Sequence, residues 1–350
     1  MLVGKISIML RIKAIIFIFS FSLLANASSA GANCLIFGDN ERLSNFCLLE
    51  SVQGRIVDQK TAAIVTQKLR QEGYFGGLGT LLTTVNVYPD ASYSNNINGG
   101  NPDKPLIIGD LEFKGESNLV AKKGIVFGLN LQSSARKTYG EGKYINAYMF
   151  GAFLASPAHN LTFTNARIGL CSKNKFTENM YFDACALAGT QNKEITKDTS
   201  QTISASLSKL KKLDGFGFVE KRIGFTRLIT NNYSQNQANI SFDAIHLNDL
   251  YSTVTIQFGE KLHNQLVMRR GINAALSSLF DGKKYSLSLS HQYSSGGILL
   301  GVSRFDTINK VTVTTNISAT TQISVGLTQV ESTIDYYDQI YPSVALTHTW

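Results

Sequence analysis

Several segments of the chain alternate between apolar and polar residues with a period of two. In ISASLS at 203–208, three apolar residues occupy one face and three serines occupy the other. STVTIQFG at 252–259, YSLSLSHQ at 285–292 and ISVGLTQ at 323–329 follow the same scheme. Successive side chains of a β-strand point to opposite faces, so this alternation predicts strands with one apolar face.

About sixteen candidate strands follow Thr84, and each has roughly the nine to eleven residues that a tilted membrane strand requires. A total of fourteen is the alternative count. The clearer segments lie near 85–94, 105–114, 123–132, 143–155, 160–171, 200–210, 237–247, 250–260, 283–293, 297–306, 309–319, 321–331 and 341–350, and the weaker ones lie near 178–188, 216–228 and 265–277.

The polar faces of these segments decide between two architectures. They consist mostly of Ser, Thr, Asn, Gln and Gly, and charged residues make up only 17% of the chain. A soluble sandwich places Lys and Glu on its outer face, whereas a transmembrane barrel places apolar residues against lipid and uncharged polar groups in a wet lumen. We therefore predict an all-β fold, an antiparallel transmembrane β-barrel of about 14–16 strands. A soluble β-rich adhesin or sandwich is the less favoured alternative.

Turn-forming sequences separate the candidate strands, with NNINGGNPDK at 95–104 as the first. If the segment before the barrel lies in the periplasm, this loop joins strands one and two and faces the cell exterior. One stretch, GTQNKEITKDT at 189–199, is long where the count expects a short turn. Further turns are expected at 133–142, 211–215, 280–284 and 294–297.

The first thirty residues have the pattern of an export signal. Lys5, Arg11 and Lys13 precede the apolar run at 14–24, which is too short to remain as a membrane-spanning helix. Asn33 before Cys34 disfavours a lipid-attached cysteine, because that chemistry prefers Gly or Ala there. We predict a signal peptide at 1–30, a periplasmic segment at 31–82 and an outer-membrane β-barrel at 83–350.

The segment at 31–82 is predicted to hold one short helix. Asp58 is a suitable N-cap for a helix through Arg70, with Val65 and Leu69 on one face and Gly73 after its end. A helix in the periplasm is the first interpretation, and a plug inside the lumen is the second. The glycine-rich YFGGLG at 74–79 lacks the context of a phosphate loop.

The four cysteines form two local pairs, Cys34 with Cys47 and Cys171 with Cys185. An oxidising periplasm permits two disulfides, although four cysteines allow three connectivities. Neither pair has CxxC spacing and no histidine is near either pair in sequence, so we predict no metal site.

Charge and histidine content argue against nucleic acid binding and catalysis. The net charge of +8 includes three leader cations, which leaves +5 (8 − 3), and no basic block is interleaved with aromatic residues. We therefore expect no nucleic-acid partner. His291 lies beside serines, as chance allows in a serine-rich strand, and we predict no catalytic residue, no cofactor and no enzyme. The other histidines are His159, His246, His263 and His348.

Four cations are candidates for biasing a channel toward anions, and a role as rim or loop charges is the alternative for each. They are Arg167, Lys209, Arg227 and Arg304.

The last segment, YPSVALTHTW at 341–350, has the pattern of a membrane-insertion signal. Val344, Leu346 and Trp350 share one face, and the barrel-insertion machinery is expected to recognise a terminal aromatic residue when the last strand closes against the first. An indole is also a suitable anchor at the membrane interface.

Deletion of Trp350 should therefore reduce membrane insertion far more than Thr349→Ala does, because the insertion machinery recognises only the apolar face and only that face is anchored at the interface. The measurement is the yield of each variant in the outer-membrane fraction. Equal yields would contradict the assignment of Trp350.

YPDASYSNNINGGN at 88–101, followed by PLIIGDLEF at 105–113, resembles the start of the barrel domain in the surface lipoprotein assembly modifier family. Residues that match that family's opening motif are Pro89, Tyr93, Asn96, Ile97 and Asn98. The resemblance covers about twenty residues as a motif and implies a barrel of about fourteen strands that helps lipoproteins reach the cell surface. The helical repeat domain that usually precedes that barrel is not recognisable in this sequence.

We therefore expect an integral protein of the bacterial outer membrane that assists placement or export of surface lipoproteins. A passive porin-like diffusion channel is the alternative, and a barrel enzyme is the least favoured hypothesis. The expected partners are outer-membrane lipid, the barrel-insertion machinery and surface lipoproteins.

Overall fold

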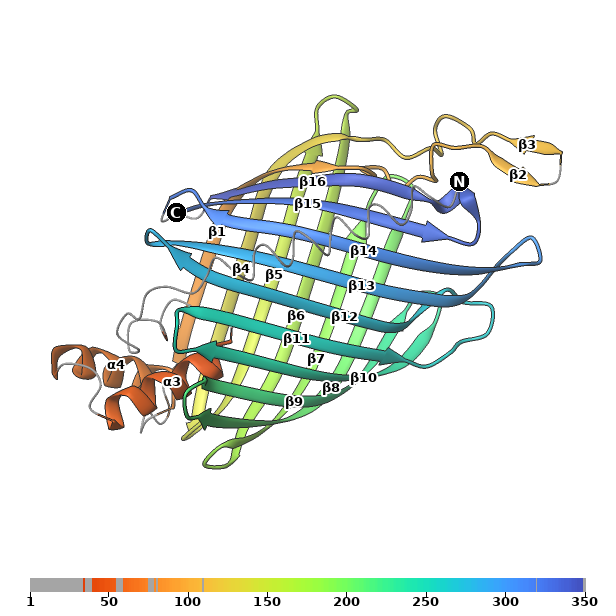
Figure 1. Ribbon diagram of the computed structural model, residues 1–350. Coiled ribbons are helices and arrows are strands. Elements are labelled where there is room, and N and C mark those ends of the chain that lie inside the picture. The colour runs from red at the N-terminus through yellow and green to blue at the C-terminus, as the bar shows by residue number, and fades with distance from the viewer. Residues whose placement is uncertain are drawn as a thin grey trace.

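The computed structural model describes residues 34, 40–54, 59–74, 79, 81–108, 110–318 and 320–348 of the chain. In this part of the chain, fourteen antiparallel strands form one closed barrel (Figure 1). The barrel strands are β1 Leu81–Ser94, β4 Gly124–Gly140, β5 Lys143–Ser156, β6 Leu161–Thr177, β7 Met180–Asn192, β8 Lys197–Leu213, β9 Gly217–Thr230, β10 Ser234–His246, β11 Leu250–Gly259, β12 Val267–Phe280, β13 Lys283–Leu299, β14 Val302–Asn316, β15 Thr321–Ser332 and β16 Gln339–His348.

The barrel closes through β1, which pairs with β4 on one side and with β16 on the other. The closing register places Asp90 opposite Thr347 and Ser92 opposite Ala345. Every other barrel strand pairs with its neighbours in chain order. A closed barrel satisfies the backbone hydrogen bonds of all its strands between neighbours, which is the condition for crossing a membrane with β-structure.

The side chains follow the predicted alternation. On β8, Ile203 and Leu207 are exposed on the outer surface, while Ser208 lies on the opposite face and contacts a residue inside the barrel. The outer surface therefore carries the large apolar residues that a soluble protein would bury. Examples from the strands are Val85, Leu129, Phe153, Ile168, Leu170, Ile203, Ile223, Phe225, Ile240, Phe258, Leu327 and Ile340.

The fourteen strands of the barrel agree with the lower of the two predicted counts and correct the higher one, sixteen. The segment predicted as a strand at 105–114 forms a small separate hairpin, β2 Leu106–Ile108 and β3 Leu111–Phe113, which extends away from the barrel (Figure 1). The strand predicted at 297–306 contains the end of β13 and the beginning of β14, and the strand predicted at 309–319 is the rest of β14. The turns predicted at 133–142 and 294–297 lie largely within β4 and β13.

Two helices precede the barrel where the sequence predicted one. The helix α4, Gln59–Gln71, lies where a helix at 58–70 was expected, and Gly73 follows it with a φ of 82°. Tyr74 N–H donates to Leu69 C=O at 2.8 Å, which satisfies a carbonyl at the helix end. The predicted cap, Asp58, lies outside the described residues. The unpredicted helix is α3, Glu41–Gln53. No helix in the described ranges is long and apolar enough to cross a membrane.

The two ends of the barrel differ. At one end, β1 begins, β16 ends and α3 and α4 lie nearby (Figure 1). We call it the helix end. Its strands are joined by short turns such as Gly140–Lys143, where Gly142 has a φ of 64° that favours glycine. The other end carries residues 95–123, which join β1 to β4 and include β2 and β3. We call it the loop end.

Candidate functional site: the lumen and the helices in its mouth

The helix α3 sits in the mouth of the barrel at the helix end and is capped by a residue that also contacts the wall. The Asn40 side chain accepts a hydrogen bond from Leu43 N–H at 3.1 Å, as an N-cap does. Its amide nitrogen donates to Glu220 Oε2 at 2.6 Å and to Asp243 Oδ2 at 3.1 Å. One side chain therefore starts the helix and joins it to β9 and β10.

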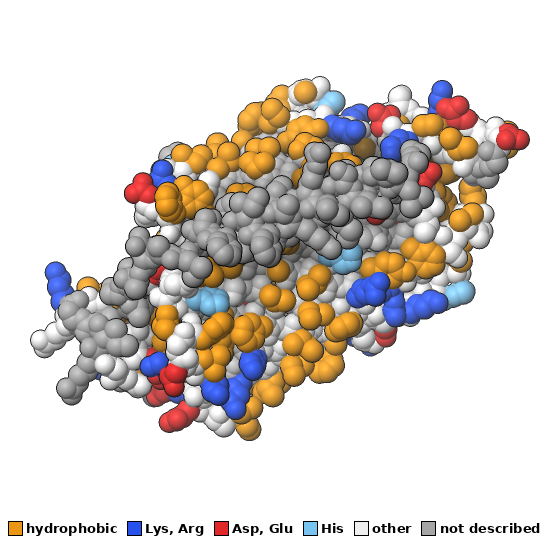
Figure 2. All heavy atoms as spheres, viewed as in Figure 1, with side chains coloured by type: hydrophobic (Ala, Val, Ile, Leu, Met, Phe, Trp, Pro, Cys, Tyr) orange, Lys and Arg blue, Asp and Glu red, His pale blue; other side chains and the backbone are white. Residues whose placement is uncertain are grey.

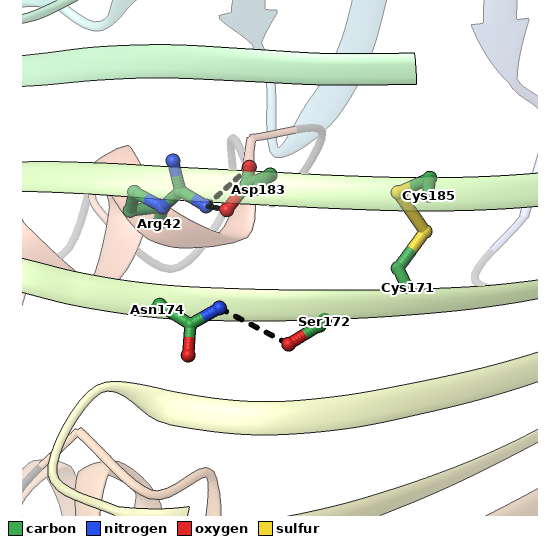
Figure 3. Close-up of a disulfide and its surroundings, with 6 residues drawn as sticks. All are labelled: Arg42, Cys171, Ser172, Asn174, Asp183 and Cys185. Atoms are coloured by element: carbon green, nitrogen blue, oxygen red, sulfur yellow. Dashed lines mark hydrogen bonds and ion pairs between the residues drawn. A yellow bond between two sulfur atoms is a disulfide. The ribbon is translucent and has the colours of Figure 1, made fainter. Parts of the chain in front are cut away.

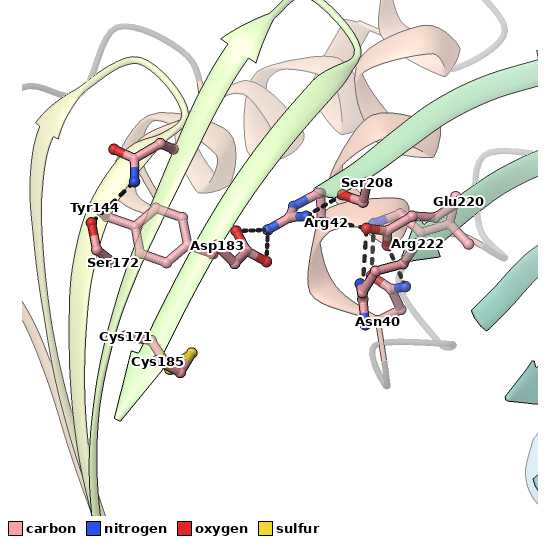
Figure 4. A network of polar contacts seen from close by, with 12 residues as sticks. Asn40, Arg42, Tyr144, Cys171, Ser172, Asp183, Cys185, Ser208, Glu220 and Arg222 are labelled. Atoms are coloured by element: carbon pink, nitrogen blue, oxygen red, sulfur yellow. Dashed lines mark hydrogen bonds and ion pairs between the residues drawn. A yellow bond between two sulfur atoms is a disulfide. The ribbon is translucent and has the colours of Figure 1, made fainter. Parts of the chain in front are cut away.

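Arg42 is the centre of a polar network between α3 and the wall (Figure 4). Its side chain is 5% exposed, and its Nη2 donates to both carboxylate oxygens of Asp183 at 2.6 Å. Its Nη1 donates to Ser208 Oγ at 2.5 Å and to Glu220 Oε1 at 3.1 Å. The guanidinium also lies over the Tyr181 ring. Arg42 thus touches three neighbouring strands, β7, β8 and β9.

The buried arginine and two of the carboxylates in this network have oppositely charged partners. Burial alone would lower the pKa of Arg42, but the carboxylates of Asp183 and Glu220 outweigh it and hold the pKa above its ordinary value. Glu220 has a second cation, Arg222, at 3.0 Å. Asp243 accepts hydrogen bonds from Asn40 and from the Tyr251 hydroxyl. A buried arginine with carboxylate partners makes docking of α3 specific, and loss of the arginine would leave Asp183 without its cation.

A second ionic contact fixes the beginning of α3 to the other side of the mouth. The guanidinium of Arg136, on β4, forms a bidentate ion pair with Glu41 and lies over the Tyr144 ring. Lys212, on β8, approaches Glu50 at 3.8 Å near the far end of the helix. These contacts hold both ends of α3.

Apolar packing completes the contact between the helices and the wall. Leu43 and Leu48 from α3, Val65 and Leu69 from α4, and Tyr74 are buried together. The phenol of Tyr74 meets that of Tyr144 at 3.2 Å, and burial raises the pKa of Tyr74. The wall residues in this cluster come from six strands, β5 and β7 to β11, and are Tyr144, Tyr181, Leu210, Phe218, Ile245 and Tyr251.

The helices are also tied to each other. Asn45 of α3 donates to Glu72 Oε2, just after α4, at 2.6 Å. Burial raises the pKa of Glu72, and the hydrogen bond from Asn45 partly opposes that rise. The disulfide Cys34–Cys47 lies in the same cluster. We call residues 34–74 the plug, meaning its described residues.

The second disulfide, Cys171–Cys185, joins directly opposite residues of β6 and β7 (Figure 3). Asp183 reaches Arg42 in the lumen, and Cys185 is two residues further along the same strand, so the disulfide lies on the lumen face. Both disulfides are the local pairs that the sequence suggested.

Beyond the plug, the lumen face is polar and mostly uncharged. Hydrogen bonds between facing hydroxyls, such as Ser277 with Ser286 at 2.7 Å and Thr314 with Ser324 at 2.9 Å, line it. Other side chains on this face, set by the register of the ladders, are Asn86, Gln132, Ser204, Ser206, Asn239, Thr255, Gln257, Asn273, Ser288, Ser290 and Thr312.

The segment 95–101, which we call the lumen loop, folds into the mouth at the loop end. Ile97 is 3% exposed and packs against Val126 and Leu154. Their strand neighbours Phe127 and Phe153 are exposed on the outer surface, so Val126 and Leu154 point inward. The lumen loop therefore covers the inner face of the wall.

Asn98 holds this loop in place and is fully buried. Its Nδ2 donates to Val120 C=O at 2.8 Å, and its Oδ1 accepts from Lys122 N–H at 2.9 Å. Its carbonyl accepts from Ile195 N–H at 2.9 Å, in the turn between β7 and β8. The loop thus crosses from β1 to β7.

Lys193, in that turn, donates to Asn96 C=O at 2.8 Å. Burial lowers its pKa, and Asp198 opposes the shift.

The motif residues of the predicted family loop lie in two places. Pro89 and Tyr93 are in β1, whereas Asn96, Ile97 and Asn98 form the lumen loop. The loop is at the end opposite the helices, but it is packed, because Gly99 and Gly100 lie against Thr196 and the backbone of Leu119–Ala121. The hairpin β2–β3 is the exposed part of this connection.

The four candidate cations divide between the two faces. Arg167 faces the lumen, because it shares the face of Cys171 and alternates with the exposed Ile168. Arg304 also faces the lumen, where its Nη2 is bound to Asp306 at 2.6 Å. Lys209 and Arg227 alternate with lumen residues and lie on the outer surface.

The histidines are separated from the serines beside them in sequence. His291 lies on the outer surface and contacts Asn309 at 2.8 Å, whereas Ser288 and Ser290 face the lumen. His246 contacts Ser252 and the Phe216 ring, and His348 contacts Thr321. Among the described residues no group of three His, Cys, Asp or Glu side chains could hold a metal ion.

The membrane-insertion signal is described in part. Val344 and Leu346 are exposed on the outer face of β16, and Trp350 lies outside the described residues. Its role as an insertion signal stays a prediction.

No protein-family model and no curated protein sequence matches this chain. Among solved structures, Pseudomonas putida OprB is 8% identical with a TM-score of 0.44, covering 78% of this chain and 94% of that one. Salmonella typhi OmpF, in a complex with daunomycin, is 8% identical with a TM-score of 0.44, covering 78% and 98%. The KdgM porin is 11% identical with a TM-score of 0.31, covering 53% and 93%. These low values describe a likeness between barrels and nothing finer.

The closed barrel and its apolar outer surface place this chain in the bacterial outer membrane.

Proposed function

We propose that this protein is a passive, porin-like channel for small hydrophilic solutes, and that the plug restricts its mouth on the periplasmic side. The observation that carries the proposal is the uncharged polar lumen face within a closed barrel of fourteen strands. A lumen lined by hydroxyl and amide groups is wet and offers weak, exchangeable hydrogen bonds to a passing solute.

The plug and the lumen loop give this channel two restrictions. The loop narrows the mouth at the loop end, and the helices fill part of the mouth at the helix end. The helix end is assigned to the periplasm because the chain enters the barrel there and the longer connection lies opposite. Opening requires that the plug leave the wall, to which it is held by side-chain contacts and by the hydrogen bond from Gly142 N–H to Gly73 C=O.

Lumen charges favour a modest preference for anions. Asp183, Glu220 and Asp306 are each paired with an arginine, which cancels their charge. Arg167 lines a hollow of about 250 Å³ and, like Lys310, has no ion-pair partner among the described residues. The preference is modest because Asp90 and Asp198 also face the lumen.

Planar-bilayer recordings test this proposal. The refolded protein should conduct in steps, with a reversal potential in a KCl gradient that favours chloride. The double variant Arg167→Gln/Lys310→Gln should weaken that preference, because it removes two lumen cations that have no ion-pair partner in the described residues. Arg227→Gln removes the same charge from the outer surface and should leave the reversal potential unchanged. A protein that never conducts, even with the plug removed, would contradict the channel.

The role in placing surface lipoproteins, implied by the family resemblance, has less support. The three loop residues of its motif are used in local packing at the loop end. No observation beyond that motif favours a protein cargo, so the passive channel is the better supported proposal.

A further inference from the structure

Two lysines face each other directly on the outer surface of the barrel. Lys209 on β8 and Lys221 on β9 are opposite partners in the ladder, and both are exposed. Residues in such positions have Cβ atoms about 5 Å apart, and like charges there oppose pairing of the strands. Lys211, also exposed, is two residues further along β8 on the same face.

These three lysines lie at the edge of the apolar outer surface. Going toward the loop end, the next outward residues are Leu207 on β8 and Ile223 on β9, and Phe182 lies beside Leu207 on β7. Going toward the helix end, the strands reach the turn between Leu213 and Gly217. Figure 2 shows basic side chains beside hydrophobic ones at this end of the barrel.

The positive charge of the group is not matched by the protein. Among the described residues, none of the three lysines has a hydrogen bond, an ion pair or a ring contact. The carboxylate of Glu220 points into the lumen, where it is bound to Arg42, and the described residues Glu178 and Asp214, in the adjacent turns, form no ion pair with these lysines. A direct Lys–Lys pair without an acid beside it is an unfavourable arrangement unless an anion from outside the protein lies between the two ammonium groups.

We propose that Lys209, Lys211 and Lys221 bind the phosphate of an anionic phospholipid in the leaflet at the helix end. A headgroup phosphate between Lys209 and Lys221 converts their repulsion into two favourable contacts. The acyl chains then lie along Leu207, Ile223 and Phe182. This apolar continuation favours a lipid over a free phosphate ion, which would gain nothing from it.

The test compares lipid retention by the whole protein in vesicles that contain phosphatidylglycerol and phosphatidylcholine. Wild type, after detergent extraction, should retain phosphatidylglycerol in native mass spectra. The variant Lys209→Gln/Lys211→Gln/Lys221→Gln should retain it roughly a hundredfold more weakly, since each lysine near an anionic surface contributes about fivefold. Heat-modified gel migration confirms that the variant is folded.

A matched variant removes three other lysines from the outer face at the same end. Lys137, Lys143 and Lys283 lie on β4, β5 and β13, and no two of them are opposite partners. Their replacement by glutamine should leave retention of phosphatidylglycerol near the wild-type value. An equal loss of phosphatidylglycerol retention in both triple variants would mean that retention depends only on the net charge of the barrel, and it would overturn the proposal.

Two further outcomes would also overturn it. Displacement of the lipid by inorganic phosphate would identify a site for a free ion, and equal retention of phosphatidylcholine would mean that the lysines do not select the charge. The assay does not use conductance, so failure of the channel proposal would leave its result unaffected.

Discussion

Replacing Arg42 by alanine should open the mouth at the helix end and raise the conductance of the refolded barrel. Arg42 is the cation shared by Asp183 and Glu220 in a buried network. Removal of one partner from a buried ion pair costs about 3–5 kcal/mol. Here Asp183 loses its arginine and Glu220 keeps only one cation, Arg222. Moving α3 away from the wall lets water reach both carboxylates, so the variant relieves this cost by displacing the plug.

Single-channel recording measures the effect. Arg42→Ala should give larger steps or a larger fraction of time in the open level than wild type. Lys60→Ala is the control, since Lys60 is an exposed residue of α4 with no partner in the described residues. Wild-type steps and wild-type open time in Arg42→Ala would refute the plug as a restriction.

Replacing Asn98 by alanine should release the lumen loop at the opposite mouth. The substitution removes the side-chain acceptor of Lys122 N–H and the donor to Val120 C=O. Each buried polar group left without a partner costs about 1–3 kcal/mol. Apolar packing of the loop rests on one side chain, Ile97, so the loss is large relative to that packing.

Limited proteolysis from the outside of proteoliposomes should then cut the segment at 95–101, which wild type protects. Asn95→Ala serves as the control, because Asn95 makes no hydrogen bond within the described residues. Unchanged protection in Asn98→Ala would show that the loop is held by contacts other than those of Asn98.

Alternation identified the barrel because it is a local property of each strand. The faces of Ile203 and Ser204 can be assigned from neighbouring residues alone, and the register then follows from the need to keep the apolar face of each strand toward the lipid. The number of barrel strands could not be predicted in this way, because it depends on which segments pair with each other. LIIGDLEF at 106–113 has the apolar content of a wall strand, but its two halves pair with each other in a hairpin.

Strand length was underestimated for a related reason. Beyond the apolar belt, β4 continues through SSARKTYG with no lipid to face, so its alternation is weak although its ladder is intact. β14 was divided because Thr307 and Asn309 interrupt the apolar face.

The plug was harder to predict than the wall. The buried face of α3 includes Arg42, Ser44 and Asn45, and this mixed face hides the helical period that revealed α4. The partners of Arg42 leave a signal in the sequence: Asp183 is an isolated acid on the lumen face of β7, and Glu220 shares the lumen face of β9 with one other charged residue, Arg222. Their common cation could not be found, because it comes from a segment more than 140 positions away in the chain.

The plug is joined to the barrel by a short piece of chain. Tyr74 and the start of β1 at Leu81 are seven positions apart, and Gly142 N–H holds the carbonyl of Gly73 at 2.8 Å. Seven residues reach at most about 25 Å, so a displaced plug stays near its own binding site. Its effective concentration there is on the order of millimolar or higher. Reclosing is therefore a first-order process whose rate does not depend on how much protein the membrane contains.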